Sequence, residues 1–200
     1  MAANDPLDPL RRATDRLNAA EAERNRMLRQ LRSTRLPLAK LSEAADLSVG
    51  TVHRLTRPSV LVSVGYEGKT IEQFMGVLRE MNVATLVDVR ENAMSRKRGF
   101  SRRGLEAACA DSAVAYVHEP TLGNPTHNRD GFREGSAASV KAYEDHMTTA
   151  GAGALQRIAQ LLIRQTVALL CFEADPCSCH RSVVSAYLQR TDPLAEIRLA

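Results

Sequence analysis

Val167-Ala-Leu-Leu-Cys-Phe-Glu-Ala-Asp-Pro-Cys-Ser-Cys-His-Arg181 joins an apolar run to an acidic bend, which is followed by a cysteine, a histidine and an arginine. The apolar run predicts a buried β-strand, and the final three residues stand where a helix is expected to begin. Open α/β sheets bind ligands beyond the carboxyl ends of their strands, and helix N-termini favour anions. This stretch therefore predicts an α/β fold with a functional site at the end of the strand.

Similar apolar runs recur through residues 60–200 and alternate with helical segments. Strands are expected at 60–64, 84–89, 114–117, 167–172 and 196–199. Helices are expected at 70–81, 101–110, 137–164 and 179–189, with a break at 151–153 and a long polar loop at 119–136. A capping box at Thr70–Gln73 marks one helix start, and Ser101 can cap another. This alternation predicts an α/β domain at 60–200 with a mostly parallel, Rossmann-like sheet and helices on both faces.

Residues 1–58 are expected to form a separate, all-α domain. Apolar residues at near-heptad spacing predict one amphipathic helix from Asp8 to Arg35. Its apolar stripe must pack on the following helices or on a second copy of the chain. A homodimer through this helix is therefore a possible assembly.

Residues 38–55 resemble the helix-turn-helix family of DNA-binding modules. Asp46 takes the tight-turn position, where the family usually has glycine, and Ser48 caps the second helix. In that family the second helix enters the major groove of DNA. The residues that the resemblance places toward DNA are Ser48, Val49, Thr51, His53, Arg54 and Arg57.

The distribution of charge favours DNA as a partner of the first domain. Residues 1–60 contain 11 basic and 7 acidic side chains, whereas residues 61–200 contain 16 of each. A local basic excess beside a neutral domain is typical of a module that contacts nucleic acid. The alternative is a three-helix cap on the larger domain that does not bind DNA.

Polar residues follow each of the first four expected strands. They are Tyr66 and Glu67, Asp88 and Arg90, His118 and Glu119, and Cys171 and Glu173. Because the carboxyl ends of parallel strands meet at one edge, these side chains are expected to gather there.

Five ordered segments carry a resemblance to a known family: Val62-Ser-Val-Gly-Tyr66, Leu86-Val-Asp-Val-Arg90, Ser95 to Ser101, Tyr116 to Asn124, and Cys171 to Arg181. Together they resemble the family named domain of unknown function 488, over about residues 60–200. The resemblance implies the fold but no established activity. Cys177 does not belong to the motif.

Four residues are candidates for catalysis: Cys179, Asp88, His118 and Glu173. A thiol at a helix start beside Arg181 favours the thiolate, so Cys179 is a candidate nucleophile; it is alternatively a ligand-site residue or a structural one. Asp88 can act as an acid or base, or can pair with Arg90 on the same face of the strand. His118 and Glu173 are each a candidate general base or, alternatively, a hydrogen-bonded residue at the end of a strand.

Basic residues near the same edge predict a pocket for an anionic small molecule or nucleotide. The candidate ligand-binding residues are Tyr66, Arg90, Arg96, His180 and Arg181. The alternative for the basic run at 96–103 is a solvated loop.

No metal and no cofactor are expected. The spacing of Cys171, Cys177, Cys179 and His180 differs from paired zinc motifs, and the adjacent Cys179 and His180 are expected to diverge at a helix start. A Walker-type phosphate loop and a dinucleotide-binding glycine motif are absent from the sequence.

Three functions remain open at this point. The first is a DNA-associated protein whose α/β domain binds or processes an anionic ligand. The second is a ligand- or redox-sensing DNA-binding regulator without turnover, and the third is a scaffold with a helical dimerisation cap. The choice between enzyme and non-enzyme stays undecided.

The sequence also predicts a cytoplasmic protein with no membrane partner. The N-terminus lacks an apolar signal-peptide core, and the longest apolar run, residues 166–172, is too short to span a bilayer. Four cysteines in a reducing compartment are expected to be free thiols.

Overall fold

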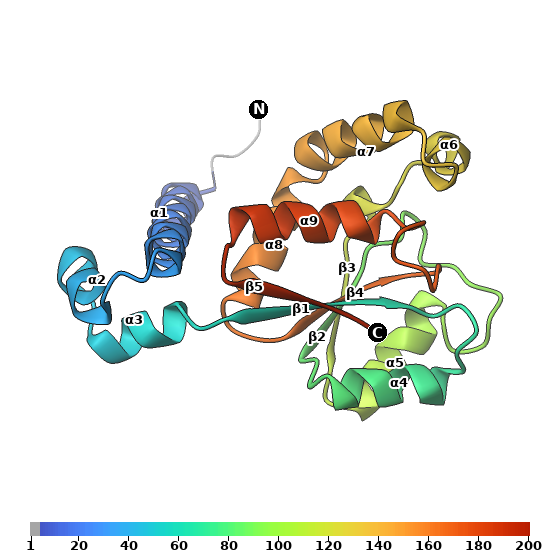
Figure 1. Ribbon diagram of the computed structural model, residues 1–200, viewed down its shortest axis with the longest axis horizontal. Helices are drawn as coiled ribbons and strands as arrows, with labels where there is room; N and C mark the ends of the chain where they lie inside the picture. The colour runs from blue at the N-terminus through green and yellow to red at the C-terminus, as the bar shows by residue number, and fades with distance from the viewer. Residues whose placement is uncertain (1–4) are drawn as a thin grey trace. The chain divides into compact units, whose positions relative to one another are not determined.

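The computed structural model describes residues 5–200, which divide into two compact units (Figure 1). The helical unit comprises the chain up to Arg57 together with Asp192–Leu194. The α/β unit comprises Pro58–Thr191 and Ala195–Ala200. Within the described residues, no helix is both long and apolar enough to cross a membrane.

The helical unit contains α1 (Asp8–Ser33), α2 (Leu38–Ala45) and α3 (Val49–Leu55). Its core is formed by Leu28, Leu41 and Val52. The apolar stripe of α1 packs only in part, because Leu10 and Leu17 are 65% and 61% exposed.

The turn between α2 and α3 has the local structure that the sequence predicts. Asp46 adopts the left-handed conformation, with φ 51° and ψ 47°. The Ser48 side chain accepts a hydrogen bond from the Thr51 backbone N–H at 3.1 Å and so caps α3. Val49, His53 and Arg54 are exposed on α3, Thr51 is half-buried, and Arg57 is exposed beyond the helix.

A five-stranded, all-parallel sheet forms the centre of the α/β unit, with strand order β3-β2-β4-β1-β5. The strands are β1 (Ser59–Gly65), β2 (Thr85–Asp88), β3 (Ala115–His118), β4 (Val167–Cys171) and β5 (Ala195–Leu199). β4 is buried along its whole length, as expected of a strand covered on both faces.

Helices cover both faces of the sheet, so the expected fold class is confirmed (Figure 1). α4 (Ile71–Glu80) and α5 (Arg102–Asp111) pack Phe74, Leu78 and Leu105 against one face. α7 (Ala137–Thr149), α8 (Ala152–Leu162) and α9 (Arg181–Thr191) pack on the other face, through side chains such as Met147, Ile158 and Leu188.

Local signals in the sequence place several helix ends correctly. The Thr70–Gln73 capping box is formed at the start of α4. Ser101 is the N-cap of α5, although its side chain makes no capping hydrogen bond. The expected break between α7 and α8 occurs at Gly151, where an added Cβ would lie 2.6 Å from the Met147 carbonyl oxygen.

Two expectations about local structure are wrong. Residues 119–136 are not a plain loop, because they contain η1 (Pro120–Leu122), η2 (Thr126–Asn128) and α6 (Arg129–Arg133). Burial of Leu122 and Phe132 holds this segment on the domain. In addition, α9 begins at Arg181 rather than at Cys179, so Cys179 and His180 precede the helix.

Candidate functional site

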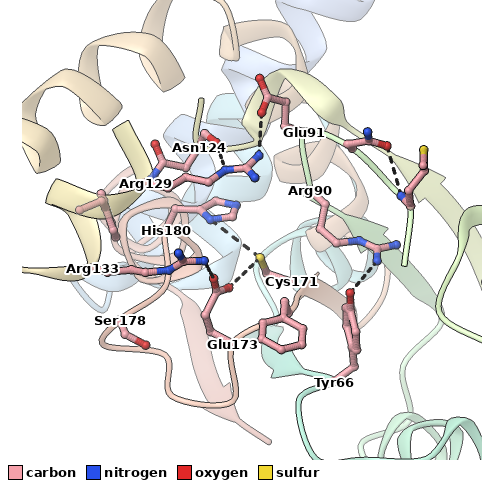
Figure 2. A pocket seen from close by; sticks show the side chains of 14 residues that line it. Tyr66, Arg90, Glu91, Asn124, Arg129, Arg133, Cys171, Glu173, Ser178 and His180 are labelled. Atoms are coloured by element: carbon pink, nitrogen blue, oxygen red, sulfur yellow. Dashed lines mark hydrogen bonds and ion pairs between the residues drawn. The ribbon is translucent and has the colours of Figure 1, made fainter. Parts of the chain in front are cut away.

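A pocket of about 290 Å³ opens at the carboxyl ends of the strands (Figure 2). Its walls come from the segments that follow β1, β2 and β4, and from the segment that contains α6. We call it the edge pocket. Its lining includes Tyr66, Arg90, Arg129, Arg133, Cys171, Glu173 and His180.

Aromatic rings form one wall of the edge pocket. Tyr66 stacks on Phe100 with ring centroids 4.4 Å apart, and Phe172 meets Tyr66 edge-on at 5.3 Å. Phe100 is fully buried, so Tyr66 is held by the core on the side away from the pocket. The arrangement fixes the position of the Tyr66 hydroxyl group.

Asp88 and Arg90 form a buried ion pair beneath this wall, which confirms the expected pairing. Arg90 donates from Nε to Asp88 Oδ1 at 2.8 Å and from Nη2 to Oδ2 at 2.5 Å. Asp88 also accepts a hydrogen bond from the Tyr116 hydroxyl group at 2.7 Å. Burial disfavours the charged form of Arg90, but the hydrogen bonds and charge of Asp88 outweigh it and raise the pKa of Arg90.

Both N–H groups of Arg90 Nη1 are also engaged. Its Nη1 donates to the Tyr66 hydroxyl oxygen at 3.1 Å and to the Phe100 carbonyl oxygen at 2.9 Å. Arg90 therefore orients the aromatic wall and has little capacity left for a ligand. Asp88 is fully buried and lies outside the pocket lining.

Cys171, Cys179 and His180 come together at the floor of the pocket, and we call them the Cys–His cluster. Their ligand atoms all lie within 4.8 Å of one another. His180 Nδ1 is 3.9 Å from each of the two sulfur atoms. The expectation that Cys179 and His180 diverge is wrong, because their donor atoms lie 3.9 Å apart just before α9.

A backbone hydrogen bond fixes the ring of His180. Its Nε2 lies 3.1 Å from the Val89 carbonyl oxygen, and because a carbonyl can only accept, Nε2 carries the proton. In the neutral ring, Nδ1 is then an unprotonated nitrogen directed at the two sulfur atoms. Figure 2 shows the Cys171 sulfur between the His180 ring and the Glu173 carboxylate.

Arg181 contacts the Cys–His cluster through Cys179 and is fully buried. Its Nε donates to the Cys179 sulfur at 3.2 Å, and its Nη2 donates to the Glu173 carbonyl oxygen. Among the described residues, Arg181 makes no ion pair with a carboxylate, and its Nη1 has no hydrogen-bond partner. A buried guanidinium needs a compensating negative charge, and the Cys179 sulfur is the group in position to supply it.

The two thiols of the cluster have opposite tendencies to ionise. A hydrogen bond from Cys171, together with the nearby charge of Arg181, lowers the pKa of Cys179 to about 5 despite burial. The same hydrogen bond and burial raise the pKa of Cys171 well above its ordinary value. Cys179 is therefore the more acidic thiol of the pair.

Glu173 presents an ionised carboxylate at the edge of this cluster. Its Oε2 lies 3.0 Å from the Cys171 sulfur, and its Oε1 accepts from Arg133 Nη2 at 3.3 Å. Burial disfavours ionisation, but hydrogen bonds from the Cys171 thiol and the Glu173 backbone N–H outweigh it and lower the pKa of Glu173 to about 2. Glu173 is therefore ionised and can accept hydrogen bonds in the pocket.

Two arginines that were not predicted from the sequence also line the pocket. Arg129 and Arg133 come from one turn of α6, and their side chains are 38% and 52% exposed. Arg129 pairs with Glu91 at 2.6 Å and also donates to the Asn124 carbonyl oxygen. Their spacing of four residues places both on one helix face. The sequence contains this spacing, so it could have indicated that the two arginines lie side by side.

Other predicted residues lie away from the pocket lining. Arg96 is exposed and does not line the pocket. His118 is half-buried, with its Nε2 2.9 Å from the Arg90 carbonyl oxygen. Cys177 is exposed, whereas Cys179 is almost fully buried beneath Cys171.

Comparisons with curated proteins and with solved structures gave no match. The sequence model of one family, described as domain of unknown function DUF488, matches residues 70–188, which is more than half of the chain. The match spans β2, β3 and β4. It includes every residue that lines the edge pocket except Tyr66, which follows β1. It confirms the resemblance carried by the ordered motifs, and the chain therefore belongs to the DUF488 family.

Proposed function

We propose that this protein associates with DNA through α3, and that its α/β domain binds and processes a small anionic ligand in the edge pocket. One observation carries the ligand half of the proposal. Arg129 and Arg133 project from one turn of α6 into a pocket whose floor holds Cys171, Glu173 and His180.

The two arginines suit an anion because their side chains are fixed by ion pairs and still have free N–H donors. Each has a carboxylate partner that fixes its position, and each is still at least one-third exposed. Within the described chain, no hydrogen bond engages Arg129 Nη1 or Arg133 Nε. Guanidinium groups with unused N–H donors bind phosphate and carboxylate with paired hydrogen bonds.

The Glu173 carboxylate supplies a hydrogen-bond acceptor in the same pocket as the two arginines. It lines the pocket together with Cys171 and Tyr66. An ionised carboxylate in such a position can orient a ligand or a water molecule by accepting its hydrogen bond. This arrangement supports processing of the ligand in addition to binding.

Removing the two arginine charges should weaken anion binding. The double variant Arg129→Gln, Arg133→Gln is expected to bind inorganic phosphate about tenfold or more weakly, because a charge-assisted hydrogen bond contributes about 1.5–3 kcal/mol. Isothermal titration calorimetry of the metal-free protein with phosphate and with a mononucleotide measures the effect.

The matched control is Arg103→Gln, an exposed arginine of α5 outside the pocket. Its phosphate affinity should equal that of the wild type. Equal affinities for all three proteins, or no binding by the wild type, would contradict the ligand proposal.

The DNA half of the proposal is supported by the geometry of the helical unit. Asp46 makes the tight turn, Ser48 caps α3, and Val52 anchors α3 in the core. The opposite face leaves Val49, His53 and Arg54 exposed. An exposed basic helix of this kind is suited to the major groove and to backbone phosphates.

Loss of two basic residues at α3 should reduce DNA binding and its salt dependence. The variant Arg54→Gln, Arg57→Gln is expected to bind a random duplex about tenfold or more weakly at low salt. The slope of log K against log salt should fall by about 2, because two phosphate contacts are lost. Fluorescence anisotropy across a salt series measures both quantities.

The control Arg16→Gln, Arg103→Gln removes the same charge from exposed positions outside α3. It should change the affinity by less than the α3 variant does. If the wild type does not bind duplex at low salt, the helical unit is a cap and the DNA proposal is wrong.

A further inference from the structure

The donor atoms of the Cys–His cluster have the spacing of a metal site. Both sulfur atoms lie 3.9 Å from His180 Nδ1, and all three donors fall within 4.8 Å of one another. Zinc bonds of about 2.3 Å to sulfur and about 2.0 Å to nitrogen place tetrahedral ligands roughly 3.5 Å apart. The nitrogen–sulfur distances would have to shorten by a few tenths of an ångström, and the sulfur–sulfur distance by at most about 1 Å, to close the cluster around an ion.

His180 is already oriented as a ligand. Its Nε2–H donates to the Val89 carbonyl oxygen, so its Nδ1 lone pair faces the sulfur atoms. Metal-bound histidines regularly donate their second N–H to a carbonyl or a carboxylate in this way. The Tyr143 ring also packs edge-on against His180 at 5.4 Å, which restricts rotation of the imidazole.

Arg181 suits a coordinated thiolate at Cys179. It is fully buried and donates from Nε to the Cys179 sulfur. Its Nη2 donates to the Glu173 carbonyl oxygen, and its Nη1 has no hydrogen-bond partner in the described part of the chain. A divalent cation would offset the thiolates that hold it, and N–H donors to the sulfur would stabilise the complex.

The cluster also leaves one side open to the edge pocket. Cys171 and His180 line the pocket, whereas Cys179 is almost fully buried and does not line it. Glu173 Oε2 is 3.0 Å from the Cys171 sulfur, on the pocket side. Three protein ligands with a fourth position facing a pocket is the arrangement of catalytic rather than structural zinc sites.

We propose that Cys171, Cys179 and His180 bind one divalent transition-metal ion, zinc by the character of the ligands, with its fourth position open to the edge pocket. Thiolate and imidazole ligands favour zinc over magnesium or calcium. The ion would sit where an anion held by Arg129 and Arg133 could reach it. The inference goes beyond the proposed function, because the ion needs neither the arginines nor DNA.

Cobalt is the probe for the test, because Co²⁺ occupies zinc sites and is coloured. Chelator-treated, reduced full-length protein is titrated with Co²⁺ without oxygen, and absorption is recorded in the near-ultraviolet and visible ranges. One equivalent should produce thiolate-to-cobalt charge transfer and intense tetrahedral d–d bands. Addition of Zn²⁺ should abolish both.

Single variants identify the ligands. Cys171→Ser, Cys179→Ser and His180→Asn should each weaken Co²⁺ binding about a hundredfold or more, which exceeds the usual loss when only a hydrogen-bond partner of a ligand is changed. Cys177→Ser and Cys109→Ser are the matched controls, one exposed and one buried in the core on the α4 and α5 face. Both should reproduce the wild-type spectrum.

Thermal unfolding of the wild type provides a second test that does not depend on the variants folding. Stoichiometric Zn²⁺ should raise its melting temperature, because a ligand that binds only the native state stabilises it. No stoichiometric cobalt spectrum, or a spectrum lost in Cys177→Ser and kept in Cys171→Ser, would overturn the proposal. Phosphate binding by the metal-free protein could fail without affecting any of these outcomes.

Discussion

Asp88→Ala is expected to destabilise the α/β domain by about 3–5 kcal/mol, because it leaves the buried guanidinium of Arg90 without its counter-charge. The Asp88 side chain is 0% exposed and the Arg90 side chain is 7% exposed, so water cannot replace the lost carboxylate. The Tyr116 hydroxyl group would also lose its acceptor. Urea unfolding, together with hydrogen exchange at the amides of β4, measures the effect within this domain.

The matched control for this change is Glu106→Ala. Glu106 pairs with Arg102 at 2.9 Å on the surface of α5, where the two side chains are 43% and 61% exposed. Exposed pairs contribute little, so the loss should stay below about 1 kcal/mol. Similar losses for the two variants would show that the buried pair does not organise the wall of the edge pocket.

Gly65→Ala should damage both stability and ligand binding. An added Cβ at Gly65 would lie 1.9 Å from the Glu173 carbonyl oxygen and 2.9 Å from Ala174 Cα. These are backbone atoms, and the Glu67 N–H bond to the Phe172 carbonyl oxygen at 2.9 Å holds their segment in place. We expect a loss of about 3 kcal/mol, near the upper end for overpacking, and at least about tenfold weaker phosphate binding.

Gly76→Ala is the control for the glycine substitution. Gly76 lies inside α4, and its added Cβ would meet only the end of the Arg79 side chain at 3.9 Å. Alanine is favoured over glycine within a helix by about 0.5–1 kcal/mol, so this variant should be slightly more stable than the wild type. Calorimetric unfolding and phosphate titration distinguish the two variants. An unaffected pocket in Gly65→Ala would contradict the packing described here.

Much of the fold could be predicted because its signals are local. Apolar runs gave the strands, Thr70 and Gln73 marked the start of α4, and Asp46 marked the turn before α3. Tyr66, Arg90, Glu173 and His180 were expected at one edge of the sheet, and all four line the same pocket. This follows from the rule that the carboxyl ends of parallel strands share an edge.

The parts that were missed depend on local backbone geometry and on distant contacts. Cys179 and His180 were expected to diverge at a helix start, but both precede α9 and their donor atoms lie close together. Arg129 and Arg133 were assigned to a loop because glycine and proline are frequent there. Burial of Phe132, which the composition does not reveal, orders α6 and turns both arginines to the pocket.

The order of the strands has a consequence for how the chain acquires its structure. β1 is the first strand to be synthesised, yet its partners in the sheet are β4 and β5, which follow after every other strand. Pairing between segments so far apart in the chain slows folding, because a long loop must close first. During synthesis β1 remains an unpaired apolar segment until β4 leaves the ribosome, which makes the nascent chain dependent on protection from aggregation.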